Sequence, residues 1–170
     1  MAPAELEQQL KPDGHWVIYT DIGSDRPTLW RVPIVGGAPT QVTQVFSHAA
    51  DVSPDGNLMA SYTADERPSS FWQIGIFDVA RGQRVKIFPN AMRYRAPIRW
   101  TPDGRALTYV DAKNGFVNIW IQPLAGGEPK QLTDFGGDEI FAFDWSRDGK
   151  YLACVRGTWT ADLALITNFE

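Results

Sequence analysis

Few side chains of this sequence have the types and the spacing that catalysis requires. Asp134–Gly136 reads Asp-Phe-Gly, the metal-binding triplet of protein kinases, but no His-Arg-Asp catalytic loop and no glycine-rich nucleotide loop accompany it. A serine hydrolase needs a Gly-x-Ser-x-Gly motif and a histidine base. The sequence lacks this motif, and its two histidines are His15 and His48. We therefore interpret Asp134–Gly136 as a loop and predict a chain that is not an enzyme.

Metal and cofactor chemistry find equally little support. Neither histidine belongs to a cluster of residues with metal-ligand spacing, so we predict no metal site and no cofactor. The single cysteine, Cys154, lies in the apolar run Tyr151–Val155, which indicates a buried and unreactive thiol. Paired carboxylates for glycoside hydrolysis stay open, because such pairing is spatial and leaves no fixed spacing in a sequence.

The elements that must position any site are joined by a four-residue turn that recurs four times. Its sharpest copy reads Ser-Pro-Asp-Gly: Ser or Thr bonds the backbone, Pro presets φ, and Gly supplies a positive φ. The copies are Lys11–Gly14, Ser53–Gly56, Thr101–Gly104 and Ser146–Gly149. Their glycines are 42, 48 and 45 residues apart. A strand-turn-strand unit with a period in the forties is typical of a β-propeller blade.

The period divides the chain into four units, at about residues 5–43, 48–88, 96–133 and 140–167, within a single domain of residues 1–170. We expect each unit to be a four-stranded antiparallel sheet, with a polar first strand over residues 5–11. The fourth unit has a third strand at Asp162–Ile166 and lacks its outer strand. The predicted fold is all-β, an incomplete or open propeller of about four blades.

Unpaired strand edges invite pairing with another chain. Two interpretations follow from the small number of blades. The chain is the C-terminal part of a larger propeller, which we favour, or two chains complete one ring of about eight blades as a homodimer.

Several runs of residues resemble a known repeat. The order is Pro-Asp-Gly, an apolar strand, Ile-Trp, Gly-Gly and then Gln-Leu-Thr, and the runs are Ile119–Gly127, Lys130–Phe135, Phe143–Lys150 and Arg156–Thr158. They resemble the TolB-like, WD40-like repeat, and most closely the C-terminal propellers of bacterial sensor proteins, in which a membrane-tethered Ser/Thr kinase or a winged-helix regulator precedes the blades. The likeness covers nearly the whole chain. It departs at Lys11 and Arg147 within the turns, and where Arg81-Gly82 replaces Gly-Gly.

Three charged residues occupy equivalent positions, two residues before the Ser or Thr of successive turns. They are Asp51, Arg99 and Asp144. One interpretation is a structural ladder of ion pairs or hydrogen bonds between blades near the central channel. The other is a charged channel rim that binds an ion or a ligand.

Binding is expected on one face, formed by two families of loops. The first family connects an outer strand to the next inner strand, and the second connects strands two and three. The segments are residues 46–48, 90–95 and 136–140 in the first, and residues 21–27, 64–70 and 111–116 in the second. Candidate binding residues are His48, Arg67, Arg93, Tyr94 and Arg95, because Arg and Tyr are enriched at interaction hot spots.

Composition excludes some classes of binding partner. The net charge is −4, from 16 basic and 20 acidic residues, which argues against nucleic acid. No apolar stretch is long enough for membrane insertion, and the N-terminus does not read as a signal peptide. The resemblance implies a non-catalytic protein- or ligand-binding module, the sensor or scaffold part of a larger bacterial protein, outside the cytoplasm. The alternative is the accessory propeller of a hydrolase, either a peptidase or a glycan-active enzyme.

Overall fold

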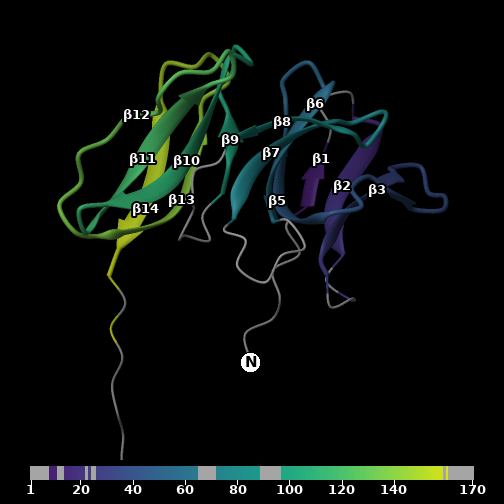
Figure 1. Cartoon of the computed structure of the whole chain (residues 1–170), viewed down its shortest axis with the longest axis horizontal. Coiled ribbons are helices and arrows are strands. Elements are labelled where there is room, and N and C mark those ends of the chain that lie inside the picture. The colour runs from purple at the N-terminus through teal and green to yellow at the C-terminus, as the bar shows by residue number, and fades with distance from the viewer. Residues whose placement is uncertain are drawn as a thin grey trace, which may run out of the picture.

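The computed structural model describes residues 8–10, 14–21, 23, 26–64, 72–88, 97–158 and 160. Within these ranges the chain is all-β, with four antiparallel sheets in sequence order and no helix (Figure 1). It is an open propeller, and we number its blades 1 to 4. The third strand predicted for blade 4, at Asp162–Ile166, lies outside the described residues.

Blades 1 to 3 each contain four strands in simple up-and-down order, and blade 4 contains two described strands. Blade 1 is β1 (Gln8–Leu10), β2 (Trp16–Asp21), β3 (Thr28–Pro33) and β4 (Thr40–Gln41). Blade 2 is β5 (Phe46–Val52), β6 (Leu58–Ala64), β7 (Gln73–Asp78) and β8 (Arg84–Phe88). Blade 3 is β9 (Arg99–Trp100), β10 (Ala106–Lys113), β11 (Phe116–Pro123) and β12 (Lys130–Gln131). Blade 4 is β13 (Glu139–Trp145) and β14 (Leu152–Gly157).

The recurring turn has the same hydrogen bonds in blades 2, 3 and 4. In blade 3 the hydroxyl of Thr101 donates to Asp103 Oδ1 at 2.6 Å and accepts the backbone N–H of Ala106 at 3.0 Å. Asp103 Oδ1 also accepts the N–H of Arg105, and Gly104 has the predicted positive φ, 68°. The corresponding bonds of Ser53 with Asp55 and of Ser146 with Asp148 are 2.6 and 2.7 Å long. Each turn therefore closes on itself through one hydroxyl and one carboxylate.

The buried copy of this turn should contribute more to the unfolding free energy than the exposed copy does. Thr101 is 8% exposed, so Thr101→Val leaves the N–H of Ala106 buried without an acceptor, and we expect a loss of about 2 kcal/mol of unfolding free energy. The bonds of Ser146 are exposed, so Ser146→Ala should cost about 1 kcal/mol or less. Urea denaturation of both variants measures this, and equal losses would contradict the assignment.

A second recurring set of hydrogen bonds holds the outer strand in blades 1 and 3. The hydroxyls of Thr43 and Thr133 accept the backbone N–H of Leu29 and Ile119, at 3.0 and 2.9 Å. The side-chain amide of the glutamine two residues earlier donates to the carbonyl of the same threonine in both blades. The Gln-x-Thr part of the repeat is therefore a clamp that fixes β4 and β12 to the strand beside them.

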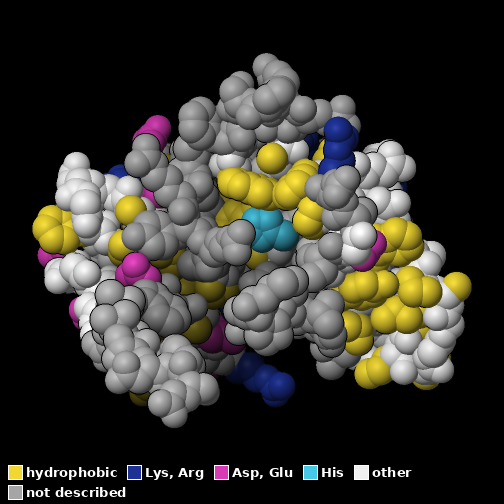
Figure 2. All heavy atoms as spheres, turned by 90° about the horizontal axis from the view of Figure 1, so that it is seen from below, with side chains coloured by type: hydrophobic (Ala, Val, Ile, Leu, Met, Phe, Trp, Pro, Cys, Tyr) yellow, Lys and Arg dark blue, Asp and Glu magenta, His cyan; other side chains and the backbone are white. Residues whose placement is uncertain are grey.

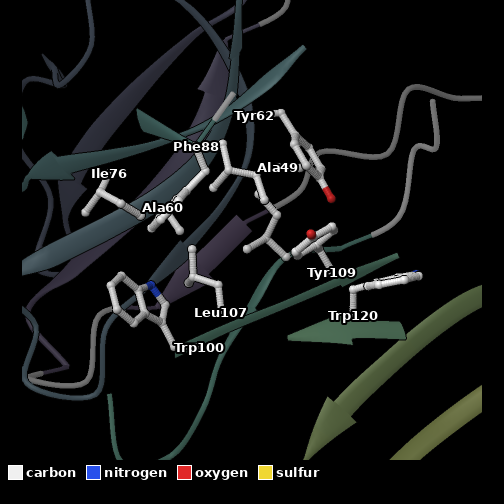
Figure 3. Close-up of a cluster of buried hydrophobic side chains, with 11 residues drawn as sticks. Ala49, Ala60, Tyr62, Ile76, Phe88, Trp100, Leu107, Tyr109 and Trp120 are labelled. Carbon is white, nitrogen blue, oxygen red and sulfur yellow. The ribbon is translucent and has the colours of Figure 1, made fainter. Parts of the chain in front are cut away.

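The hydrophobic core lies between the blades. Blades 1 and 2 share one cluster, around Ile18, Leu29 and Met59, and blades 3 and 4 share another, around Ile119 and Phe143. Blades 2 and 3 share the largest cluster (Figure 3), which contains Ala49, Ala60, Tyr62, Ile74, Ile76, Phe88, Ile98, Trp100, Leu107, Tyr109 and Trp120. Blades 2 and 3 thus each pack one face on the blade before and the other face on the blade after.

Candidate functional site

The three charged inner-strand residues lie close together, at the junctions of blades 2, 3 and 4. Asp51 reaches from β5 to blade 3, where its Oδ2 accepts the backbone N–H of Trp100 at 2.7 Å. The indole N–H of Trp100 donates to the backbone carbonyl of Asp51 at 3.0 Å. Arg99 Nε lies 3.7 Å from Asp144 Oδ1 on the next blade. This arrangement has the form of the inter-blade ladder, whereas its use as a ligand rim stays a prediction.

Burial makes Asp51 unusual among the carboxylates. Desolvation raises the pKa of Asp51 from 3.8 to about 6, and the nearby charge of Asp144 acts in the same direction. The N–H of Trp100 and the charge of Arg99 oppose this rise without cancelling it. In the turns, by contrast, the hydroxyl of Ser53 donates to Asp55 and holds the pKa of that carboxyl below its ordinary value. The pKa of Asp51 is therefore raised toward neutral pH.

His48 belongs to a group of aromatic rings that we call the aromatic cluster: Phe46, His48, Tyr62 and Trp72. The His48 ring lies 4.5 Å from the Trp72 ring, edge to face, and 5.3 Å from the Tyr62 ring. The rings of Phe46 and Trp72 are 4.8 Å apart. Such distances are those of attractive aromatic pairs. Figure 2 shows a histidine side chain set among hydrophobic side chains on the face seen from below.

A β-bulge positions His48. The register of β5 on β6 shifts between His48 and Asp51, and Ala49 within this shift has φ of 54°. Bulges turn a strand and re-aim its side chains, and they are frequent beside functional sites. The prediction of a loop over residues 46–48 is wrong, because these residues form the first half of β5. The bulge allows β5 to bend there without ending.

The four predicted cationic and tyrosine residues of the loop face lie outside the described residues. These are Arg67, Arg93, Tyr94 and Arg95. Their segments are nevertheless attached to the described site, because residues 65–71 connect Ala64 to Trp72 and residues 89–96 follow Phe88. Phe88 pairs with Ile74, in the strand that begins just after Trp72.

Blade 3 brings a further cation and an indole to the junction with blade 2. Lys113 Nζ lies 3.9 Å from the centre of the Trp120 ring, a cation–π contact. Trp120 Nε1 is buried and has no hydrogen-bond partner among the described residues. Lys113 ends β10, and Phe116 begins β11, so the predicted loop over residues 111–116 is wrong. A tight turn at Asn114-Gly115 with positive φ at both residues replaces it. Sequence reasoning missed Lys113 and Trp120, although the Asn-Gly pair was a signal for this hairpin.

Nothing in the described part of the chain assembles a metal site, since no three His, Cys, Asp or Glu residues gather there. The described residues include no helix that could span a membrane. Asp134–Gly136 lies between β12 and β13, where the backbone N–H of Phe135 donates to Asn118 Oδ1 at 2.7 Å. Arg156 stacks on the Phe135 ring at 3.7 Å, so the triplet packs as an inter-blade connection. Cys154 is only partly buried, not fully buried as predicted, and this partial burial still raises the pKa of its thiol.

Four sheets packed face to face, with Ser/Thr-x-Asp-Gly turns in blades 2, 3 and 4, define a β-propeller of the TolB-like class. Residues 53–145 match the family described as the dipeptidyl peptidase IV N-terminal region, and the chain belongs to this family. It is 32% identical over 104 residues to the uncharacterized peptidase YuxL of Bacillus subtilis, covering 58% of this chain and 15% of that protein.

Solved structures share the fold at low sequence identity. TolB from Acinetobacter baumannii has a TM-score of 0.77 at 23% identity, covering 91% of this chain and 38% of that one. A chain in the crystal structure of a nidogen/laminin complex has a TM-score of 0.68 at 17% identity, covering 89% of this chain and 56% of that one. This chain therefore spans only part of the length of each protein that it resembles.

Proposed function

We propose that this propeller segment is a non-catalytic binding module that recognises a protein or peptide through the face around the aromatic cluster. The observation that carries the proposal is the cluster itself, in which the partly buried Phe46, His48 and Trp72 lie together at strand ends. The buried ring of Tyr62 supports His48 from the core. Aromatic side chains with a polar tip dominate protein interaction hot spots. The bulge beside His48 supports it, because a positive φ at a non-glycine residue such as Ala49 needs a packed environment to hold it.

The chemistry of the neighbouring residues favours a partner with aromatic and acidic groups. Lys113 is a cation at the junction of blades 2 and 3, held over the Trp120 ring. Arg67, Arg93 and Arg95 belong to the two segments attached to this site. The nidogen/laminin complex is a solved structure in which a similar fold accompanies a protein partner. The same proposal includes a sensor or scaffold role in a larger bacterial protein, outside the cytoplasm.

A displayed library of random peptides, selected on the immobilised chain, tests the proposal. Peptides that bind the chain should lose at least about tenfold in affinity with His48→Ala, and also with the triple variant Arg93→Ala, Tyr94→Ala, Arg95→Ala. Val85→Ala is the control, because Val85 lies on the outer strand of blade 2 and is 57% exposed. If both site variants bind as well as the control, the face is not the binding site.

The second candidate function is the accessory propeller of a hydrolase. The family match and the peptidase relative favour it specifically. A screen of the purified chain against peptide and glycoside substrates tests whether the chain itself has hydrolase activity. Turnover that disappears when an exposed carboxylate such as Asp144 is replaced by Asn would contradict a module that only binds.

A further inference from the structure

A single buried hydroxyl lies opposite the β-bulge of β5. His48 pairs with Tyr62 on β6, and the next pair lies three residues further along β5 but only two residues away on β6. Two residues of β5 therefore lie opposite one residue of β6, which is Ser61. This serine is 0% exposed, so its hydroxyl must find its partners inside the protein.

The Ser61 hydroxyl bonds the backbone of both residues in the pair beside the bulge. Its Oγ lies 2.9 Å from the carbonyl oxygen of His48 and 3.0 Å from that of Tyr62. A serine hydroxyl has one proton to donate, so the two carbonyls share it. The rings of His48 and Tyr62 lie 5.3 Å apart in the aromatic cluster. One buried donor therefore contacts the two backbone positions from which these rings project.

Blade 2 departs from the repeat at the position of Ser61, five residues after the turn glycine. The equivalent residues are Tyr19 in blade 1, Tyr109 in blade 3 and Cys154 in blade 4. A tyrosine hydroxyl lies at the far end of its ring, away from its own backbone, and a thiol is only a weak donor. Ser61 thus supplies a strong donor close to the main chain in the blade that carries the aromatic cluster.

We propose that Ser61 is a positioning residue of the binding site, because its hydroxyl stabilises the bulge that aims His48 into the aromatic cluster. Ser61 serves the proposed binding function, on which this role rests, without touching the partner itself. Ala49 within the bulge has φ of 54°, which is costly for a residue with a Cβ atom. The buried hydrogen bond of Ser61 opposes this cost. Without it, fewer chains have the binding-competent form, and the affinity falls in proportion to that fraction.

The peptides selected from the displayed library measure this role. Ser61→Ala should weaken their binding by at least about fivefold, since one buried hydrogen bond is lost. Ser61→Cys keeps a weak donor and should bind more tightly than Ser61→Ala. Thr63→Val is the matched control, because Thr63 is 0% exposed on the same strand and its hydroxyl has no hydrogen-bond partner among the described residues. This control should keep its affinity within about twofold.

A double-variant cycle with His48 distinguishes positioning from a general loss of stability. In the His48→Ala background, Ser61→Ala should cause no further loss of affinity, because Ser61 acts through the His48 ring. Independent losses would contradict this role. If His48→Ala weakens binding but Ser61→Ala does not, the role of Ser61 fails and the binding function stands. If neither variant changes the affinity, the binding function fails.

Nuclear magnetic resonance tests the position of His48 without any peptide. The chain has two histidines, so His15→Gln assigns the imidazole proton signals of His48. The Trp72 ring, 4.5 Å away, shifts these signals from the position of an exposed histidine. In Ser61→Ala the signals should move toward that position, while cooperative thermal unfolding shows that the chain is still folded. Thr63→Val should leave them in place. Unchanged signals in Ser61→Ala would overturn the positioning role, whether or not a peptide binds.

Discussion

Replacing Trp100 by Ala is expected to lower the unfolding free energy by about 3–5 kcal/mol, the largest effect of any single change discussed for this chain. Trp100 is 5% exposed and fills the core between blades 2 and 3 (Figure 3). Truncation removes this packing and also removes the donor to the Asp51 carbonyl, 3.0 Å away. Urea denaturation followed by circular dichroism measures the loss.

Two further variants separate the contribution of the indole hydrogen bond from that of burial at the junction. Trp100→Phe keeps an aromatic ring and loses the indole N–H, so we expect a loss of about 1–2 kcal/mol. Trp145 is the equivalent residue of blade 4, and its indole donates to Thr108 Oγ1 at 3.0 Å, but its side chain is more exposed than that of Trp100. Trp145→Ala should therefore cost less than Trp100→Ala. If the two alanine variants lose the same free energy, the burial at the central junction does not determine stability.

Asp51→Asn is expected to raise the unfolding free energy above pH 6, relative to the wild-type chain. This difference between variant and wild type should be up to about 3 kcal/mol more favourable to the variant above pH 6 than at pH 4. The pKa of Asp51 in the folded chain is about 6, above its ordinary value of 3.8. The folded state therefore binds the proton more tightly, and stability is lost as the pH rises from about 4 to about 6. Asparagine keeps an acceptor for the N–H of Trp100 at 2.7 Å and carries no charge, so this loss disappears.

The turn carboxylates change stability in the opposite direction. Hydroxyl donors hold the pKa values of Asp55, Asp103 and Asp148 below their ordinary value, so the stability that they contribute is lost as the pH falls. For this reason the test compares Asp51→Asn with the wild-type chain at each pH, using urea denaturation between pH 4 and pH 8. A free-energy difference that does not change over this range would show that Asp51 titrates normally.

The fold could be predicted from the sequence because its repeated turn is local. The hydroxyl, the carboxylate and the glycine of each turn lie within four residues, and their bonds to the following strand span five residues at most. The tryptophans were equally informative, since Trp100 and Trp145 occupy the same position in successive blades and both donate to the preceding blade. Local chemistry repeated at a fixed period therefore defines the propeller.

The candidate site was harder to predict because its geometry depends on contacts between strands. His48 was recognised as a candidate from the sequence. Its orientation depends on the positive φ of Ala49 and on the shifted register of β5. Neither could be predicted, because a positive φ is usually signalled by glycine and position 49 is alanine. Tyr62 and Trp72 look like ordinary strand residues until β5, β6 and β7 are assembled. The partners of Asp51 were also hidden, because Trp100 is 49 residues away.

The matched faces of the blades have a consequence for how such proteins change in evolution. Each unit closes its own turn, and in the described junctions each blade offers its successor one face and accepts its predecessor on the other. A tandem duplication of about 45 residues would therefore insert a blade whose two surfaces already fit its neighbours, and a deletion of one unit would rejoin two compatible surfaces. The number of blades can drift by whole units while the packing rule is kept, and a gene segment can move between propellers of different size.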